Sequence, residues 1–231
     1  MTTVSPQDHN AMSSIIITID GPAGSGKSTL AKLLAGRLGF DFLDTGAMYR
    51  AVAWASLQAN LMPQDTQTMG MIAAQLPLRM QDKHVFINDT DVTLDIRHPD
   101  VAQMASIVAS VPAVREALVT QQRTVAQGRR MVTEGRDQGS VVFPDAVCKF
   151  FLTASPVVRA SRRYSELTAA GREVDFETLL AQQQERDERD QNRACSPLVK
   201  ADGALEIDTS DLTPDEVLAL MEQTVRSVVR L

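Results

Sequence analysis

The sequence predicts a three-layer α/β fold in which a parallel sheet of about five strands lies between helices. Short apolar runs rich in β-branched residues alternate along the chain with longer amphipathic segments, a pattern typical of parallel sheets with helical crossovers. A glycine-rich turn at 21–28 joins the first such run to the first helix. Between residues 77 and 96 the apolar positions instead repeat every second residue, which predicts a small antiparallel meander.

Local patterns predict the elements of the first half of the chain. Residues 15–19 (Ile-Ile-Ile-Thr-Ile) are β-branched throughout, as in a strand buried on both faces. Leu30, Leu34 and Leu38 then repeat on one helical face until Gly39 ends the pattern. The expected order is a strand at 15–19, a helix at 28–38, a strand at 40–43, helices at 46–59 and 65–76, and meander strands at 78–80, 85–87 and 92–94.

In the second half, proline and charge mark the helices. Pro99 and Pro112 each suit the first turn of a helix, where a backbone N–H has no partner in any case. Charged residues dominate 156–194, and an amphipathic pattern covers 214–229. The expected order is two helices across 100–125, strands at 131–133 and 148–152, charged helices within 156–194, a strand at 205–207 and a closing helix at 214–229.

The composition restricts the class of protein. A length of 231 residues suits one α/β domain with an insertion, or two small domains. The net charge of −6 argues against a general binder of nucleic acid or membranes, since either would favour a basic face. Of the 23 basic residues 18 are arginines, whose planar fork suits phosphate oxygens, although codon bias explains the excess equally well.

Targeting and redox features point to the cytoplasm. Residues 1–14 are polar, without the apolar region of a signal peptide, and no stretch approaches a membrane-spanning length. The two cysteines, Cys148 and Cys195, form neither a disulfide framework nor a metal-ligand pattern. We therefore expect a cytoplasmic protein with a disordered extension at 1–14, and we expect Cys148, in its apolar run, to lie in the core.

The glycine-rich turn carries the strongest functional pattern. Residues 21–28 fit G-x-x-x-x-G-K-S, whose backbone N–H groups close around phosphate oxygens at the positive end of a helix. Lys27 would reach the β- and γ-phosphates of ATP, and the Ser28 hydroxyl would bind Mg²⁺. A turn that merely joins strand to helix is the alternative, but strand, loop and helix all lie where a phosphate loop needs them. The residues expected to bind ATP are Gly21, Pro22, Ala23, Gly24, Ser25, Gly26, Lys27, Ser28 and Thr29.

A phosphate loop alone also fits GTPases, motor ATPases and transport subunits. A GTPase switch would carry Asp-x-x-Gly and Asn-Lys-x-Asp, and neither pattern occurs in the 231 residues. The chain is also small, with its remaining polar motifs spread along its whole length. A kinase for a small acceptor is therefore the favoured interpretation.

Four segments together resemble one family, the bacterial cytidylate kinases. The segments are 17–29 (ITIDGPAGSGKST), 43–50 (LDTGAMYR), 134–146 (EGRDQGSVVFPDA) and 185–193 (ERDERDQNR). Their order and spacing match those of the family, from about residue 15 to the C-terminus, with the N-terminal tail outside the match. Departures are mild, since Gln138 and Ser140 stand where the family more often has an apolar residue and Thr, and Cys195 is unusual.

The resemblance implies the organisation of a single domain at 15–231. It implies a P-loop kinase core at 15–61 and 127–231, a monophosphate-binding insertion at about 62–126 that holds the meander, and an arginine-rich lid at about 171–195. It implies ATP, Mg²⁺ and CMP or dCMP as reactants, giving CDP or dCDP and ADP. The insertion is similar to that of the bacterial enzymes rather than the shorter eukaryotic UMP/CMP kinases.

A phosphate acceptor determines what the protein must supply. Such an acceptor is already anionic at neutral pH, so catalysis needs positioning and positive charge rather than a general base. By resemblance, Arg50, Arg136, Arg186 and Arg193 clamp the phosphates. The catalytic set is then Lys27, Arg136, Arg186 and Arg193.

The charged segment before residue 194 has two interpretations. A helix beginning near Asp175 would place four residues on one face, namely Arg186, Arg189, Asp190 and Arg193. From spacing alone, a solvated helix with Glu185–Arg189 and Arg186–Asp190 pairs explains the charges equally well. The resemblance favours the first interpretation and implies that Asp190 accepts hydrogen bonds from the ribose hydroxyls of CMP.

The CMP site would combine several motifs. Thr45 and Arg50 follow the second strand, where an acceptor phosphate should arrive; their alternative roles are a helix N-cap and an exposed charge. Asp137 has the clearest specificity logic, because a carboxylate accepts from cytosine N4 but repels uracil O4. By resemblance Ser106 and Arg115 complete the base contacts, whereas sequence alone indicates a small helical residue and a solvated charge. The expected CMP-binding residues are Thr45, Tyr49, Arg50, Ser106, Arg115, Arg136, Asp137, Asp190 and Arg193.

The leading hypothesis is thus a CMP/dCMP kinase that uses ATP, acts as a monomer and has no nucleic-acid or membrane partner. Another small-acceptor kinase, for UMP, shikimate or dephospho-coenzyme A, is the nearest alternative, and a nucleotide-binding regulator without transfer activity is a further one. Asp137 has a structural alternative as well, which is to orient Arg136 through a salt bridge. The histidines show no catalytic spacing, and we expect a structural or exposed position for His9, His84 and His98.

Overall fold

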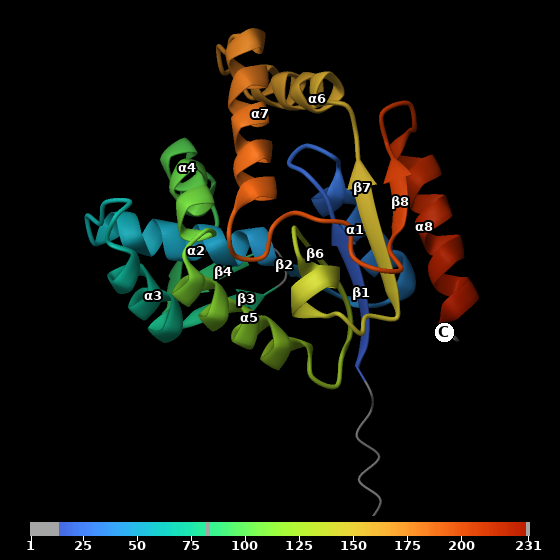
Figure 1. Cartoon of the computed structure of the whole chain (residues 1–231), viewed down its shortest axis with the longest axis horizontal. Helices are drawn as coiled ribbons and strands as arrows, with labels where there is room; N and C mark the ends of the chain where they lie inside the picture. Colours follow the sequence, from blue (N-terminus) through green and yellow to red (C-terminus); the bar gives the residue numbers. More distant parts are fainter. Residues whose placement is uncertain (1–13, 82–83, 230–231) are drawn as a thin grey trace, which may run out of the picture.

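Five parallel strands form the central sheet, in the order β2-β6-β1-β7-β8 (Figure 1). The computed structural model describes residues 14–81 and 84–229. The strands are β1 (Ile15–Asp20), β2 (Asp41–Asp44), β6 (Arg130–Gly135), β7 (Cys148–Thr153) and β8 (Leu205–Asp208). All five lie where the sequence predicted them, so the predicted parallel sheet is confirmed. The extension expected at 1–14 lies outside the described residues apart from Ser14.

Strand β1 lies in the middle of the sheet because its β-branched residues can be buried on both faces. Ile17 and Ile19 belong to one hydrophobic cluster, and Ile16 belongs to a second cluster on the other face. Parallel pairing with β6 and β7 aligns Ile17 with Val132 and Cys148. The predicted core position of Cys148 is confirmed. The phosphate loop therefore leaves the carboxyl end of the central strand, between two neighbouring strand ends.

Helices cover both faces of the sheet, which confirms the predicted three layers. On one face α1 (Lys27–Leu38) and α8 (Pro214–Val228) pack against each other and the sheet, where Leu34 and Met221 are fully buried. On the other face α2 (Thr45–Gln58) and α5 (Pro112–Ala126) pack with Ile16 and Met131 of the strands. None of the helices in the described ranges is both long and apolar enough to cross a bilayer.

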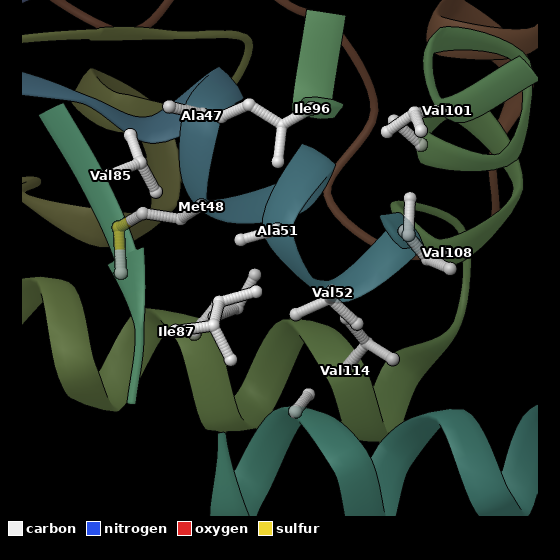
Figure 2. Close-up of a cluster of buried hydrophobic side chains, with 14 of the residues drawn as sticks. Ala47, Met48, Ala51, Val52, Val85, Ile87, Ile96, Val101, Val108 and Val114 are labelled. Carbon is white, nitrogen blue, oxygen red and sulfur yellow. The ribbon is translucent and has the colours of Figure 1, made fainter. Parts of the chain in front are cut away.

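Most of the segment predicted as an insertion, residues 62–126, lies between α2 and α5. Its elements are α3 (Thr66–Gln75), β3 (Leu78–Gln81), β4 (His84–Ile87), β5 (Thr90–Asp91), the 3-10 turn η1 (Asp95–Arg97) and α4 (Pro99–Val108). Figure 2 shows the cluster that joins it to α2, formed by Ala47, Met48, Ala51, Val52, Val85, Ile87, Ile96, Val101, Val108 and Val114. Because α2 shares this cluster with the insertion, the boundary at residue 61 between core and insertion stays a prediction.

The antiparallel meander is confirmed, but its third strand is shorter and earlier than expected. β3 and β4 pair with Leu78 opposite Ile87, whereas β5 is limited to Thr90 and Asp91. The strand expected at 92–94 is wrong, because the Asp91 carboxylate accepts a hydrogen bond from the N–H of Thr93 at 2.9 Å and turns the chain out of the sheet. Leu94 is consequently 82% exposed rather than part of an alternating strand.

Two charged helices, α6 (Pro156–Ala169) and α7 (Phe176–Asn192), pack against each other beyond the sheet. Figure 1 shows α7 between α6 and α4 of the insertion. As predicted, α7 begins after Asp175, whose carboxylate caps the helix by accepting from the N–H of Thr178 at 2.8 Å. The helix ends at Asn192, and Arg193 has an extended backbone with ψ of 138°. The prediction that Arg193 continues the helical face of Arg186 is therefore wrong.

Candidate active site

The phosphate loop between β1 and α1 has a conformation that requires glycine. Gly21 has a φ of 146°, and a Cβ at this position would collide with the carbonyl oxygen of Leu152 in β7. Gly26, the N-cap of α1, has a left-handed φ of 88°. These turns bring the N-terminus of α1 to the carboxyl edge of the sheet, where the helix dipole favours an anion.

Lys27 begins α1, and its side chain is buried beside the loop. Its Nζ donates a hydrogen bond to the carbonyl oxygen of Pro22 at 2.7 Å. Burial, followed by the positive charge of Arg136, lowers the pKa of Lys27 to about 7, although Glu134 acts in the opposite direction. A triphosphate in the loop would add negative charge next to this amine and favour its protonated form.

Glu134, near the end of β6, lies beside Ser28 and was not assigned by sequence analysis. Its Oε1 accepts a hydrogen bond from Ser28 Oγ at 2.9 Å. Burial and the charge of Asp44 raise the pKa of Glu134, while Lys27 lowers it. In the described ranges no three His, Cys, Asp or Glu side chains form a metal cluster. The adjacent oxygens of Ser28 and Glu134 nevertheless fit Mg²⁺, which usually takes only one or two carboxylates together with substrate phosphates and water.

Asp20, the last residue of β1, connects the phosphate loop to the next motif. Its carboxylate accepts from the backbone N–H groups of Gln138 and Gly139 at 2.8 and 2.7 Å. These residues begin a π-helical turn, η2 (Gln138–Val142), that the sequence patterns did not predict. Burial raises the pKa of Asp20 to about 6 against the effect of both hydrogen bonds. Position could have revealed Asp20 and Glu134, because ligands bind at the carboxyl ends of parallel strands.

The expected phosphate-clamping arginines Arg136 and Arg186 come together near the lid. Arg136 Nε donates to Asp190 Oδ2 at 2.8 Å, which joins the end of β6 to α7. Burial raises the pKa of Asp190, but Arg136 and Arg186 outweigh it and lower this pKa overall. Burial and the neighbouring Arg136 lower the pKa of Arg186 to about 10, and its buried Nε has no hydrogen-bond partner among the described residues. Arg186 is thus positioned to bind an anion.

Of the two ion pairs predicted for a solvated helix, Glu185–Arg189 and Arg186–Asp190, only the first is present among the described residues. Arg189 Nη2 does donate to Glu185 Oε1 at 2.6 Å on the surface of α7. Asp190, however, pairs with Arg136 rather than with Arg186. One face of α7 therefore carries a surface ion pair, while another face contributes to the site.

Asp137 is buried next to the guanidinium groups of Arg115 and Arg193. Its Oδ2 accepts a hydrogen bond from Arg115 Nη2, and Arg193 Nη2 lies 3.9 Å from its Oδ1. The guanidinium of Arg115 also lies 5.6 Å from the ring centroid of Tyr49. The interpretation of Arg115 as a solvated charge is wrong, because only 3% of its surface is exposed. The salt bridge between Asp137 and Arg136 is wrong as well, since Arg136 pairs with Asp190.

The other expected acceptor residues lie on α2 and α4. Thr45 Oγ1 donates to the carbonyl oxygen of Glu134 at 2.6 Å. Its alternative role as N-cap is wrong, because Asp44 caps α2 and also pairs with Arg50 at 3.3 Å. Ser106 on α4 is buried and accepts a hydrogen bond from Arg189, a contact that sequence reasoning missed.

Side chains from α6 and α7 support the phosphate loop. Arg159 Nη1 and Gln183 Nε2 donate to the carbonyl oxygen of Ala23 at 3.0 and 3.2 Å. Arg159 also forms a buried ion pair of 2.7 Å with Asp187 of α7. None of these braces could be read from local sequence, because the partners lie on different elements.

The expected structural or exposed position of the histidines is confirmed for His84 and His98. They pair with Asp91 and Asp100 on the surface of the insertion. His9 lies outside the described residues.

The fold and this site together define the class of the protein. A phosphate loop at the carboxyl edge of a parallel sheet, next to a helix that carries the half-buried Arg186, is the arrangement of a P-loop kinase. A crystal structure of an uncharacterized protein from Eubacterium ventriosum shares the fold, with a TM-score of 0.52 at 17% identity over 93% of this chain and 99% of that one.

Sequence comparison then gives the family. A family model described as cytidylate kinase matches residues 17–227. The cytidylate kinase of Caldanaerobacter subterraneus subsp. tengcongensis is 46% identical over 210 residues, which cover 91% of this chain and 94% of that protein. The cytidylate kinase of Rhodopirellula baltica is 45% identical over 216 residues and 94% of each chain. The chain belongs to the cytidylate kinase family.

Proposed function

We propose that the enzyme transfers the γ-phosphoryl group of ATP to CMP or dCMP, giving CDP or dCDP and ADP. The observation that carries the choice of acceptor is the buried carboxylate of Asp137 beside Arg115 and Arg193. Membership of the cytidylate kinase family supports the same reaction. Neither alternative acceptors nor a regulator without transfer activity is favoured by these findings.

The ATP side would be formed by the phosphate loop and Lys27. Lys27 would leave the carbonyl oxygen of Pro22 and place its ammonium on the β- and γ-phosphates. Ser28 and Glu134 would hold Mg²⁺, which neutralises charge between these phosphates when it is bound. Asp20 would hold the loop and η2 in fixed relative positions, because its carboxylate accepts hydrogen bonds from the two N–H groups at the start of η2.

The acceptor side would read cytosine through Asp137. Arg115 occupies Oδ2 of Asp137, whereas Oδ1 accepts no hydrogen bond from any described residue. That oxygen can accept from the N4 amino group of cytosine, while uracil would present its O4 carbonyl to the same carboxylate. Tyr49 and Ser106 would line the base, Asp190 the ribose, and Thr45 and Arg50 the acceptor phosphate.

Transfer between two polyanions would depend on Arg136, Arg186 and Arg193. These arginines would spread positive charge over the transferred group and both bridging oxygens. The partial burial of Arg136 and Arg186 strengthens this interaction, because a charge shielded from water is less screened. Closure of the lid would exclude the water that could otherwise accept the phosphoryl group.

A coupled assay of ADP release would test the proposal. The purified chain would be offered CMP, dCMP, UMP, AMP, GMP and shikimate separately, with ATP and Mg²⁺. We expect turnover with CMP and dCMP to exceed turnover with every other acceptor. Equal turnover of UMP would favour a broader pyrimidine kinase, and no ADP release with any acceptor would favour a regulator.

We also propose that the enzyme acts as a monomer in the cytoplasm. The two cysteines of the chain are both free, which suits a reducing compartment. Light scattering of the purified protein would give a molar mass near 25.2 kDa if this is correct. A mass twice as large would contradict it.

A further inference from the structure

Arg189 connects the lid to the insertion at one point. Its Nη1 donates a hydrogen bond to Ser106 Oγ at 2.8 Å, from α7 to α4. Across the parts of the chain that the structure describes, this is the only side-chain hydrogen bond or ion pair between α7 and residues 62–126. The residue that Arg189 contacts, Ser106, is one of the residues proposed to contact the base. The lid therefore touches the acceptor site through a group that could take part in base recognition.

The chemistry of the two side chains fixes the direction of this hydrogen bond. A guanidinium has donors only, so Ser106 Oγ must accept from Arg189. The hydroxyl proton of Ser106 then remains available, and it donates to no described residue. Ser56 behaves differently, because its hydroxyl donates back to the carbonyl oxygen of Val52 in α2 at 2.8 Å. Ser106 is thus a buried hydroxyl whose acceptor side is engaged and whose donor side is free.

We propose that Arg189 determines specificity for cytosine by holding the Ser106 hydroxyl as a hydrogen-bond donor. The proposal rests on the CMP kinase activity proposed above. Cytosine N3 is an acceptor, whereas uracil carries a hydrogen at N3 and is a donor there. A hydroxyl held as a donor suits cytosine and opposes uracil. Together, the Asp137 acceptor and the Ser106 donor would match both N4 and N3 of cytosine.

The geometry of Arg189 explains why an arginine suits this role. Its Nη2 binds Glu185 Oε1 one helical turn earlier at 2.6 Å, while Nη1 binds Ser106. The planar fork therefore makes two hydrogen bonds from two nitrogens in fixed relative positions. A lysine has a single nitrogen and could support Ser106 only by adjusting its contact with Glu185.

Replacement of Arg189 by Met tests the proposal through the ratio of kcat/KM for CMP to that for UMP. Without Arg189, the hydroxyl of Ser106 can donate back to its own helix and accept from uracil N3–H. We expect the ratio to fall by about 5- to 20-fold, mainly through CMP. Arg189→Lys should retain part of the selectivity. Arg163→Met is the matched control, because Arg163 forms a comparable exposed ion pair with Glu166 on α6.

A double-mutant cycle with Ser106→Ala separates specificity from closure of the lid. If Arg189 acts through Ser106, Arg189→Met should not lower the CMP/UMP ratio further in the Ser106→Ala background. An unchanged ratio in folded Arg189→Met, or an equal further loss in the double variant, would overturn the proposal. Equal losses for CMP and UMP would leave Arg189 with a role in closure alone. Failure of the wild-type enzyme to phosphorylate CMP would instead refute the proposed function.

Discussion

Arg159 and Asp187 form a buried ion pair of 2.7 Å that joins α6 to α7 next to the phosphate loop. Arg159 donates at the same time to the carbonyl oxygens of Ala154 and Ala23, the second of which lies in the loop. Arg159 therefore makes three contacts at once: with the residue Ala154 just before α6, with Asp187 of α7 and with Ala23 of the phosphate loop. Loss of its acidic partner should affect both the stability of the fold and the binding of ATP.

We expect Asp187→Asn to lower the free energy of unfolding by about 3 kcal/mol, because the change leaves the guanidinium of Arg159 buried without its counter-charge. Urea unfolding measures this change. The KM for ATP should rise, while the KM for CMP should change little. Glu166→Gln is the control, since the exposed Arg163–Glu166 pair should contribute less than about 0.5 kcal/mol. Equal effects of the two substitutions would contradict the prediction.

Replacement of Lys27 by Ala should strongly reduce phosphoryl transfer and preserve the fold. The ammonium is the only lysine charge in the loop, and loss of one such preorganised charge typically lowers kcat by about 10²- to 10³-fold. The fold should survive because burial already disfavours the charged form of Lys27, as its lowered pKa of about 7 indicates. Circular dichroism and ADP release would measure both effects. Near-normal turnover in the folded variant would exclude the loop from the mechanism.

Binding of ATP should take up a proton at pH 8. Burial, followed by the positive charge of Arg136, lowers the pKa of Lys27 to about 7, so the amine is mostly neutral at this pH. The negative charge of a triphosphate should raise that pKa, so up to one proton enters the complex. Calorimetry in two buffers with different heats of ionisation measures the uptake. The uptake should disappear near pH 6, where Lys27 is already protonated.

Lys27→Arg serves as the control for proton uptake. A guanidinium keeps its proton throughout the neutral and mildly alkaline range, because its ordinary pKa lies far above it. The heat of ATP binding to this variant should therefore be independent of the buffer at pH 8. Buffer-dependent heat of the same size in Lys27→Arg would assign the proton to another group.

Much of the fold could be predicted because each core element carries its own periodic pattern. The β-branched run at 15–19 and the leucine stripe at 30–38 need no distant partner to be recognised. The prediction of a third meander strand at 92–94 was wrong for a physical reason. A hydrogen bond from the N–H of Thr93 to Asp91 turns the chain before the alternating residues can pair with β4. The π-helical turn at 138–142 depends on Asp20, a residue 118 positions earlier, and no local pattern encodes it.

The candidate site also has one part that could be predicted from the sequence and one part that could not. The phosphate loop is one contiguous segment, so spacing alone identifies it. The pairing of charges is different, because Arg136 and Asp190 are 54 positions apart and Arg189 and Ser106 are 83 apart. A count of arginines and acids does not say which pairs form. The fold decides this by bringing the ends of β6, α4 and α7 together.

The lid should exchange its amide hydrogens more slowly when both substrates bind. Helix α7 is attached to the rest of the molecule through side chains such as Gln183, Asp187 and Asp190, while Arg186 has an unpartnered Nε among the described residues. Phosphates would supply the missing partner and order the helix. Hydrogen exchange across 183–194 measures this with CMP and a non-hydrolysable ATP analogue. Equal protection with and without the two ligands would refute it.

The selectivity of the enzyme for CMP should fall when Asp137 becomes Asn. Arg115 donates to Oδ2 of Asp137, so the amide oxygen of the Asn must face Arg115. Its NH₂ group then takes the place of Oδ1 and meets the N4 amino group of cytosine, donor against donor. Two donors without a shared acceptor cost about 1–3 kcal/mol, which corresponds to a roughly 5- to 150-fold loss of kcat/KM for CMP. UMP should lose less or gain, because its O4 accepts from the new NH₂.

The ratio of CMP to UMP activity is the quantity that decides this prediction. Asp137→Asn also leaves Arg115 and Arg193 with less counter-charge, so part of the protein could unfold and lower both activities. Partial unfolding lowers the concentration of active enzyme, and it lowers the activities with CMP and UMP by the same factor. The ratio of the two activities is therefore unaffected by unfolding. A ratio that stays at the wild-type value would therefore show that Asp137 only holds Arg115 in place. Cytosine recognition would then rest on Ser106 and Arg115 themselves.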